Sequence, residues 1–216
     1  MRPVLVLCDD FWHPAEVIER GFRCISQDEF SFEFVTDPKD ILTPEMISEF
    51  PVIANCKADQ LNGANKATWF DPGVTEVGVE EFNDYIMEGG GFLSLHSANT
   101  AKDKGAGYGL FAGNVFLGHP PRCPVEVKIC GPHPIVEGVS DFAIRDEHYQ
   151  IDCFAENCGL LFKTVSESGG TQVGGYALER GKGRLCVMTP GHILSVWQSP
   201  GYQRLLMNAL RWCARR

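Results

Sequence analysis

The first 56 residues alternate between short apolar runs and segments with helical spacing. The run 3–8 is continuously apolar and ends at Asp9 and Asp10, which is typical of a strand buried on both faces of a parallel sheet. Helical spacing follows over 14–25. Two further strands are expected at 32–36 and 52–56. Between them, a helix that starts with a cap residue and a proline is expected at 43–50. This β-α-β-α-β order predicts an α/β protein with a doubly wound sheet.

The rest of the chain continues the sheet and then changes character. After a polar loop at 57–75, a helix over 79–88 ends at a glycine triplet, and a buried strand over 92–95 runs directly into His96. The long connection 97–122 is expected to hold one short helix near 109–111. Five strands and a final helix are then expected at 124–130, 142–146, 159–166, 172–179, 184–189 and 200–213. Glycine turns between the last strands predict an antiparallel C-terminal extension to a mainly parallel sheet, within a single domain over 1–216.

Charge and cysteine content limit the classes of partner. The net charge is −9 and no extended Lys/Arg cluster occurs, which argues against nucleic-acid binding. The nine cysteines form no C-x-x-C pair and several lie inside apolar runs, which favours a reducing compartment, so a cytoplasmic protein is expected. No segment has the length of a membrane-spanning helix, so we expect no membrane partner. The oligomeric state stays open, with a homo-oligomer as one alternative.

Three of the six histidines follow predicted strands directly. His13 follows the first strand, His96 follows the strand after the glycine triplet, and His192 follows the last strand. In an open α/β sheet, ligands bind outside the carboxyl ends of the strands. We therefore expect these three side chains to converge on one pocket.

The segment 89–100 has the layout of a nucleophile elbow, in which a strand turns sharply into a helix or loop. An elbow lifts one side chain into the pocket, and here that residue is His96, with Ser97 and Asn99 close behind it. The alternative is a strand-end histidine that is hydrogen-bonded to backbone.

A second group, Asp146-Glu147-His148-Tyr149, follows the predicted strand at 142–146. An acidic and aromatic patch at a strand end can orient a sugar or bind a metal, with Glu147 as the best candidate. The alternative is a solvated turn with a paired histidine. Asp10 is a candidate site carboxylate at the end of the first strand.

His119 and His133 both precede a proline, which holds them extended. His133 is interpreted as part of a rigid turn, whereas His119 ends the long loop and is a candidate site residue. Aromatic residues in loops can stack on a sugar, although core packing is preferred for each of them: Trp69, Phe70, Phe111 and Phe116.

A divalent metal is a candidate cofactor, since histidine with carboxylate suits zinc, manganese or iron. No H-E-x-x-H spacing and no P-loop occur, and the glycines at 105–109 do not follow a first strand. The predicted metal ligands are His96, His119 and His192.

Six motifs in order resemble the trehalose-utilisation (ThuA-like) family: 89–100, Gly118-His119-Pro120, His133-Pro134-Ile135, 146–149, Gly181-Lys182-Gly183-Arg184 and Pro190-Gly191-His192. The resemblance covers the chain from about residue 80 to its end; Asp10 and His13 also suit it. It implies a fold similar to that of class I glutamine amidotransferases, a flavodoxin-like sheet with helices on both faces. Amidotransferases need a cysteine at the elbow, where this chain has His96, so glutaminase chemistry is not expected.

The resemblance further implies a role in sugar catabolism, with a 3-keto glycoside or related sugar derivative as substrate. The reaction would be hydrolysis, elimination or isomerisation through an enediolate, which needs a base and stabilisation of an oxyanion. The predicted catalytic residues are His96, His192 and Glu147. The predicted substrate-binding residues are Asp10, His13, Ser97, Asn99, His119 and Tyr149.

Three alternatives remain at this point. Histidine acid/base catalysis can proceed without a metal. The chain can instead be a non-catalytic domain that binds a small ligand or a partner. An amidotransferase-like thiol chemistry would need a reactive cysteine at the elbow, and the nearest candidates, Cys56 and Cys123, are not placed there.

Overall fold

The computed structural model describes all residues except 37, 39–40, 59–75, 106 and 215–216, so most of the predicted polar loop at 57–75 lies outside the described residues. The chain forms a mixed α/β structure with a nine-stranded sheet and a separate two-stranded sheet. In chain order, the strands are β1 Arg2–Leu7, β2 Phe30–Val35, β3 Val52–Asn55, β4 Gly91–Leu95, β5 Asn114–Gly118, β6 Cys123–Ile129, β7 Phe142–Asp146, β8 Gln150–Cys153, β9 Gly159–Ser166, β10 Gly170–Arg180 and β11 Gly183–Met188. The helices are α1 Ala15–Phe22, α2 Pro44–Ser48, α3 Val79–Met87, η1 His96–Thr100, α4 Gly107–Ala112, η2 Pro134–Val136, α5 Leu194–Trp197 and α6 Pro200–Cys213.

One half of the large sheet is parallel. Its strands lie in the order β2-β1-β3-β4-β11, and each neighbouring pair is parallel. This is the doubly wound order, in which a ligand binds beyond the carboxyl ends of the strands near the point where the order reverses. The carboxyl ends of β1, β3, β4 and β11 therefore share one edge.

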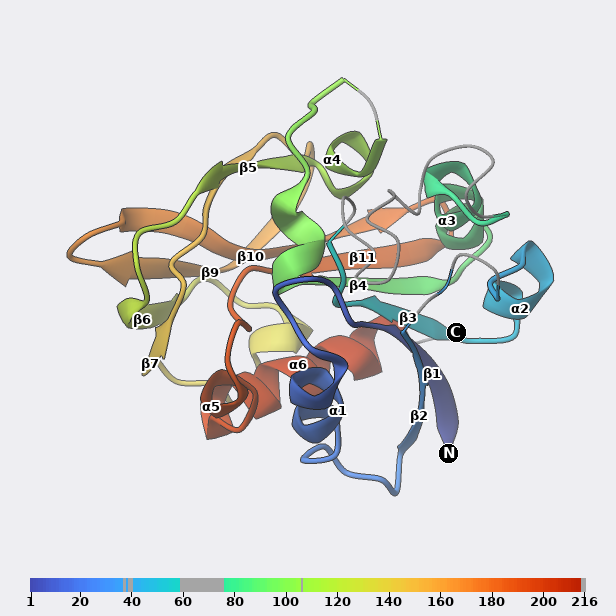
Figure 1. Ribbon diagram of the computed structural model, residues 1–216, viewed down its shortest axis with the longest axis horizontal. Helices are drawn as coiled ribbons and strands as arrows, with labels where there is room; N and C mark the ends of the chain where they lie inside the picture. Colours follow the sequence, from blue (N-terminus) through green and yellow to red (C-terminus); the bar gives the residue numbers. More distant parts are fainter. Residues whose placement is uncertain (37, 39–40, 59–75, 106, 215–216) are drawn as a thin grey trace.

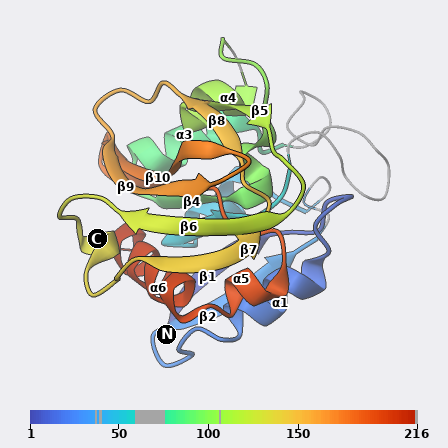
Figure 2. The ribbon, with the colours of Figure 1, turned by 90° about the vertical axis from the view of Figure 1, so that its left-hand side faces the viewer.

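The other half of the sheet is antiparallel and larger than the sequence indicated. The order continues β11-β10-β9-β6-β7, and all four pairings are antiparallel. The predicted hairpins of β9, β10 and β11 are confirmed. The strands β6 and β7 belong to this half as well, although they precede the hairpins in the chain, and they cross the front of the molecule in Figure 2.

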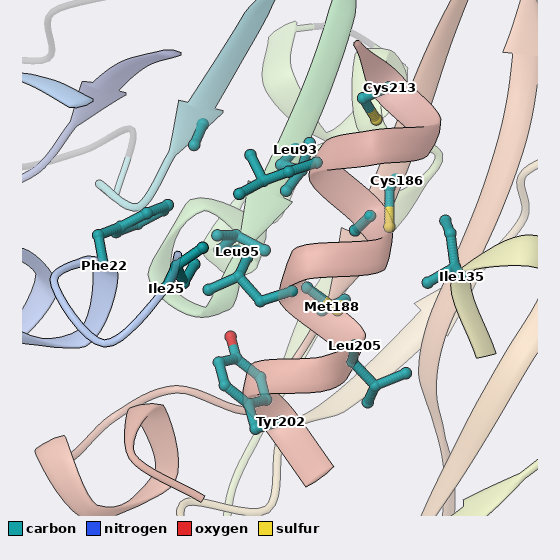
Figure 3. Packing of buried hydrophobic residues seen from close by; sticks show 14 of the residues in the cluster. Phe22, Ile25, Leu93, Leu95, Ile135, Cys186, Met188, Tyr202, Leu205 and Cys213 are labelled. Atoms are coloured by element: carbon teal, nitrogen blue, oxygen red, sulfur yellow. The ribbon is translucent and has the colours of Figure 1, made fainter. Parts of the chain in front are cut away.

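The buried strands pack into two hydrophobic clusters. Along β1, Val4 and Val6 belong to one cluster, whereas Leu5 and Leu7 belong to the other, because successive side chains of a strand point to opposite faces. The first cluster includes residues of α1 and α6, and the second includes residues of α2, α3 and α4. Figure 3 shows α6 packed over β4 and β11 in the first cluster. In Figure 1, α1, α5 and α6 lie below the sheet and α3 and α4 above it.

Local sequence signals explain most of the element boundaries. The Thr43 hydroxyl accepts a hydrogen bond from the Met46 amide at 3.2 Å, and Pro44 occupies the first helical position, as predicted for α2. The predicted bounds of α6 and of β7 and β9 are confirmed, and the short helix in the long connection is α4.

The strands β5 and β8 and the helix α5 were not predicted. The strands β5 and β8 pair only with each other as the two-stranded sheet, and α5 is a single turn before α6. Figure 1 shows β5 beside η1, so the extra sheet stands next to the edge where the parallel strands end. Among the described residues, no helix is long and apolar enough to cross a membrane.

Candidate active site

The strand β4 ends directly at His96, the first residue of η1. His96 has a φ of +41°, a left-handed conformation that costs a non-glycine residue about 1–3 kcal/mol. Its Nδ1 atom lies 2.7 Å from the Thr189 carbonyl, which can only accept, so Nδ1 carries the proton and Nε2 faces the site with a free lone pair. The chain therefore turns sharply at His96, as the elbow layout predicted. The hydrogen bond to backbone, which belonged to the alternative interpretation, is present as well, and it orients the ring.

His13 is held by Asp10 in the loop after β1. The Asp10 Oδ1 atom accepts from His13 Nδ1 at 2.7 Å and from the backbone amides of Trp12 and His13 at 2.8 and 2.9 Å, and its Oδ2 accepts from the Ala58 amide at 2.9 Å. Burial opposes ionisation of Asp10, but these hydrogen bonds and the attraction of His13 outweigh it and lower the pKa to about 2. The other ring nitrogen of His13, Nε2, is left without a hydrogen-bond partner.

His192 is placed by Asp146 across the sheet. The Gly191 and His192 amides donate to the Asp146 carboxylate at 2.7 and 3.1 Å. Burial raises the pKa of Asp146 to about 6, while the two amides and His192 act in the opposite direction. The carboxyl group at the end of β7 thus orients the turn that follows β11.

Three ring nitrogens converge on one point. His13 Nε2, His96 Nε2 and His192 Nδ1 are buried and have no hydrogen-bond partner. Together with a carboxylate oxygen of Glu147, these atoms all lie within 4.8 Å of one another. Buried polar atoms are nearly always hydrogen-bonded, so three adjacent exceptions call for a ligand. We call these four residues the histidine cluster.

Glu147 supplies the negative charge of the histidine cluster. Its Oε2 atom lies 3.2 Å from His192 Nδ1, 3.7 Å from His96 Nε2 and 3.6 Å from His119 Nε2. Burial works against ionisation of Glu147, but the surrounding imidazoles outweigh it and lower its pKa. Burial lowers the pKa of His96, and it lowers that of His192 to about 4, so both rings are neutral near pH 7.

The histidine cluster fits a divalent metal ion. Neutral imidazole nitrogens and one carboxylate oxygen are a donor set typical of zinc, manganese or iron. The Asp10–His13 pair is the carboxylate–histidine arrangement that commonly supports such ligands, and the Thr189 carbonyl does the same for His96. The cluster has His13 in the place that the sequence prediction gave to His119.

A cavity of about 380 Å³ opens above the histidine cluster, within the range of about 300–1,000 Å³ that is usual for small-molecule sites. It is lined by Trp12, His13, Ala58, Thr100, Lys102, Phe116, His119, Glu147, Tyr149 and His192. The Tyr149 ring stacks on His96, with the ring centroids 4.2 Å apart, and it also stacks on His119 at 5.7 Å. Burial raises the pKa of Tyr149 well above its usual value, so the phenol is neutral.

Several predicted site residues support the site and do not line the cavity. The Ser97 hydroxyl donates to the Cys56 carbonyl at 2.8 Å. Asn99 is buried in a network with Ser94, Asn114 and the Met188 carbonyl. Asp10 is likewise buried behind His13. These three side chains hold the strand ends in place.

Of the other histidines, His119 lines the cavity, whereas His148 and His133 have structural roles elsewhere. His119 lines the cavity, and its Nδ1 lies 2.9 Å from the Pro120 carbonyl. His148 points away, with its ring nitrogens 2.6 and 3.0 Å from the hydroxyls of Ser166 and Thr164. His133 accepts from the Ile135 amide at 3.1 Å and caps η2, so the rigid-turn interpretation is confirmed.

Four residues that line the cavity were not predicted from the sequence, namely Ala58, Thr100, Lys102 and Trp12, and the aromatic one among them is Trp12. Its signal was an aromatic residue between the first strand and His13, which reads equally well as core. Of the loop aromatics that were considered, Phe116 lines the cavity, Phe111 is buried in the core, and Trp69 and Phe70 lie outside the described residues.

The cysteines nearest to the elbow do not support thiol chemistry there. All nine cysteines are unpaired. Cys56 is buried, and burial raises the pKa of its thiol well above the usual value, which disfavours the nucleophilic thiolate. Cys123 begins β6, on the antiparallel half of the sheet.

The family model for ThuA, described as trehalose utilisation, matches residues 4–213. No protein with a curated description matches the chain.

Solved structures share the fold at low sequence identity. A ThuA-like protein from Bacteroides uniformis has a TM-score of 0.74 and 18% identity, over 98% of this chain and 91% of that one. A ThuA-like protein from Parabacteroides merdae has a TM-score of 0.75 and 16% identity, over 99% and 90% of the two chains. A cytoplasmic protein from Salmonella typhimurium LT2 has a TM-score of 0.67 and 12% identity, over the full length of both chains.

Proposed function

Because the chain belongs to the ThuA trehalose-utilisation family, we propose that it is a cytoplasmic enzyme of carbohydrate catabolism that processes a sugar derivative such as a 3-keto glycoside. The observation that carries the proposal is the set of three buried imidazole nitrogens without partners, gathered with Glu147 beside a cavity that His13, His192 and Glu147 line. A domain that only binds a sugar needs hydrogen bonds to hydroxyl groups, and it gains nothing from grouping four titratable side chains at one point.

His13, His96 and His192 are proposed to hold a divalent metal ion, with Glu147 beside them. Three protein ligands and an open position are typical of catalytic zinc sites, whereas structural sites are closed by four. When bound, the ion would supply Lewis acidity for the oxygen that becomes negatively charged in the enediolate. The ring orientations imposed by Asp10 and Thr189 prepare two of the ligands before binding.

Glu147 is proposed as the base. Its carboxylate lines the cavity, and its pKa lies below the usual value, so the group is ionised near pH 7. It would accept the proton from the carbon next to the ketone, and the electron pair left behind would expel the glycosidic oxygen from the neighbouring carbon. Addition of water to the resulting unsaturated ketone completes hydrolysis, with the proton returned to the same carbon.

His119 is proposed as the proton donor to the leaving oxygen. It lines the cavity, its Nε2 atom lies 3.6 Å from Glu147 Oε2, and its ring is oriented by the Pro120 carbonyl and by Tyr149. This role replaces the metal-ligand role predicted from the sequence, because His119 stands outside the group of atoms that lie within 4.8 Å of one another.

Metal analysis of the protein purified without a histidine tag tests the proposal. We expect near-stoichiometric zinc, manganese or iron in the wild type, in His119→Ala and in the matched control His133→Ala. The metal should be lost in His96→Ala and His13→Ala. The loaded protein is then assayed with 3-keto glucosides, where Glu147→Gln should remove turnover.

Two outcomes contradict this proposal. Metal loss in His119→Ala with retention in His13→Ala would restore the ligand set predicted from the sequence. Absence of metal after reconstitution would leave metal-free acid/base catalysis by His96 and His192, and absence of turnover as well would leave a binding domain.

A further inference from the structure

Trp12 combines two properties that rarely occur together. It lines the cavity, and it is 65% exposed. Of the other tryptophans within the described residues, Trp197 is fully buried and Trp212 is 7% exposed. An exposed indole forgoes the burial that makes tryptophan stabilising, so its position in the wall of a cavity needs another explanation.

The Trp12 backbone is fixed to the same carboxylate as the histidine cluster. Asp10 Oδ1 accepts from the Trp12 amide at 2.8 Å and from the ring of His13 at 2.7 Å. The Phe11 ring meets the indole edge-on, with centroids 4.6 Å apart and planes at 82°. The Trp12 backbone is thus positioned relative to His13 before any ligand arrives, and a fixed backbone lowers the entropic cost of binding.

The other two hydrophobic aromatic rings of the cavity are engaged within its wall. Phe116 packs on Tyr149 with centroids 4.7 Å apart, and Tyr149 stacks on His96 and His119. For Trp12, the ring contacts in the structure are confined to Phe11 among the described residues. It therefore offers an aromatic face to a ligand.

We propose that Trp12 is a specificity-determining residue that stacks against the C–H face of a pyranose ring. A pyranose presents axial C–H groups on its faces and hydroxyl groups around its rim, so one aromatic plane covers the face while polar groups reach the rim. This rests on the proposed function, because the stacked ring is that of the glycoside whose reacting carbons face the histidine cluster. Trp12 selects cyclic glycosides over open-chain polyols with the same hydroxyl groups.

The test is saturation-transfer NMR and titration of the purified protein with methyl α-D-glucopyranoside, with sorbitol as the open-chain counterpart. We expect saturation of the ring C–H protons of the glucoside and none for sorbitol. Trp12→Ala should weaken glucoside binding about tenfold, which corresponds to about 1.4 kcal/mol, and Trp12→Phe should weaken it less. Leu117→Ala is the matched control, because Leu117 is 66% exposed on β5 and does not line the cavity, and it should bind like the wild type.

Three results would overturn the proposed stacking role of Trp12: no binding of the glucoside to the wild type, equal binding of sorbitol, or unchanged binding in Trp12→Ala. Kinetics separate this failure from that of the proposed function. Turnover of a 3-keto glucoside with an unchanged KM in Trp12→Ala would contradict the stacking role and support the proposed enzyme activity. Trp12-dependent binding without turnover of any 3-keto glucoside would support the stacking role and contradict the enzyme activity.

Discussion

Asp10 and His13 form a buried pair, with Asp10 Oδ1 2.7 Å from His13 Nδ1 at the end of β1. The carboxylate also accepts three backbone amides, so it fixes both the tautomer of the ring and the course of the loop. His13 presents its Nε2 atom to the histidine cluster because Asp10 occupies the other nitrogen. The arrangement of the histidine cluster therefore depends on Asp10, which is not one of its four residues.

Replacement of Asp10 by Asn should weaken metal binding. An amide is a poorer acceptor than a carboxylate and can present its NH₂ group to the ring, so His13 loses its orientation. Loss of a residue that orients a metal ligand in this way costs about 10–100-fold in affinity. Competition with a chelator measures the affinity. Asp9→Asn is the control, because Asp9 Oδ1 accepts from the Ala15 amide at 3.1 Å and an amide oxygen can replace it. Equal affinities in the two variants would contradict the role given to Asp10.

Gly191→Ala should destabilise the fold and disturb His96. Gly191 has a φ of +145°, and a Cβ there would stand 3.0 Å from the His96 Cβ atom. Gly170→Ala is the control, because Gly170 has a φ of +67° with no atom within 4 Å of an added Cβ. We expect a loss of about 1–3 kcal/mol in urea unfolding for Gly191→Ala, a smaller loss for Gly170→Ala, and reduced metal content only in the former. Similar losses with full metal content would show that His96 tolerates the contact.

Replacement of Asn99 by Ala should lower the free energy of unfolding and leave the affinity for the glucoside unchanged. The amide oxygen of Asn99 accepts from Ser94 Oγ at 2.7 Å, and its amide nitrogen donates to the Ser94 and Met188 carbonyls at 3.2 and 3.4 Å. Asn99→Ala removes these hydrogen bonds and leaves the Ser94 hydroxyl, which still accepts from the Tyr108 hydroxyl, without this acceptor, which costs about 1–3 kcal/mol of unfolding free energy. Urea unfolding measures the loss, and titration with the glucoside should give the affinity of the wild type. Unchanged stability with weaker binding would restore the substrate-binding role predicted from the sequence.

Protonation of His133 should destabilise the fold at mildly acidic pH. Burial and the nearby charge of Arg184 lower the pKa of His133, and its Nδ1 must be unprotonated to accept from the Ile135 amide. The unfolded chain, with a histidine pKa of about 6.5, then binds the proton more readily than the folded one. The contribution of His133 to the free energy of unfolding is therefore full above that pH and falls as the pH drops below it. His133→Asn keeps an acceptor without a titrating ring. Urea midpoints between pH 7.5 and 5.5 should fall less in the variant, and parallel curves would contradict this assignment.

The sequence by itself determined most of the elements and the edge at which the site lies. The apolar run of β1, the cap and proline of α2, and the glycine turns of the last hairpins are local signals, and local signals act over a few residues. The elbow at His96 and the turn at His192 could be predicted because both follow buried strands, and parallel strands bring their carboxyl ends together.

The sequence predicted that His13, His96 and His192 converge, but only the tertiary structure decided which other side chains meet them and how the rings are oriented. The strands β5 and β8 are short and pair only with each other, 32 to 39 residues apart in their paired positions, so neither carries a strong pattern of its own. His13 joined the histidine cluster in place of His119 because Asp10 turns its ring, and Trp12 lines the cavity because the same carboxylate holds its backbone. Ring orientation depends on hydrogen bonds to distant residues, such as that from His96 to Thr189, and contacts between side chains so far apart leave no periodic trace in a single sequence.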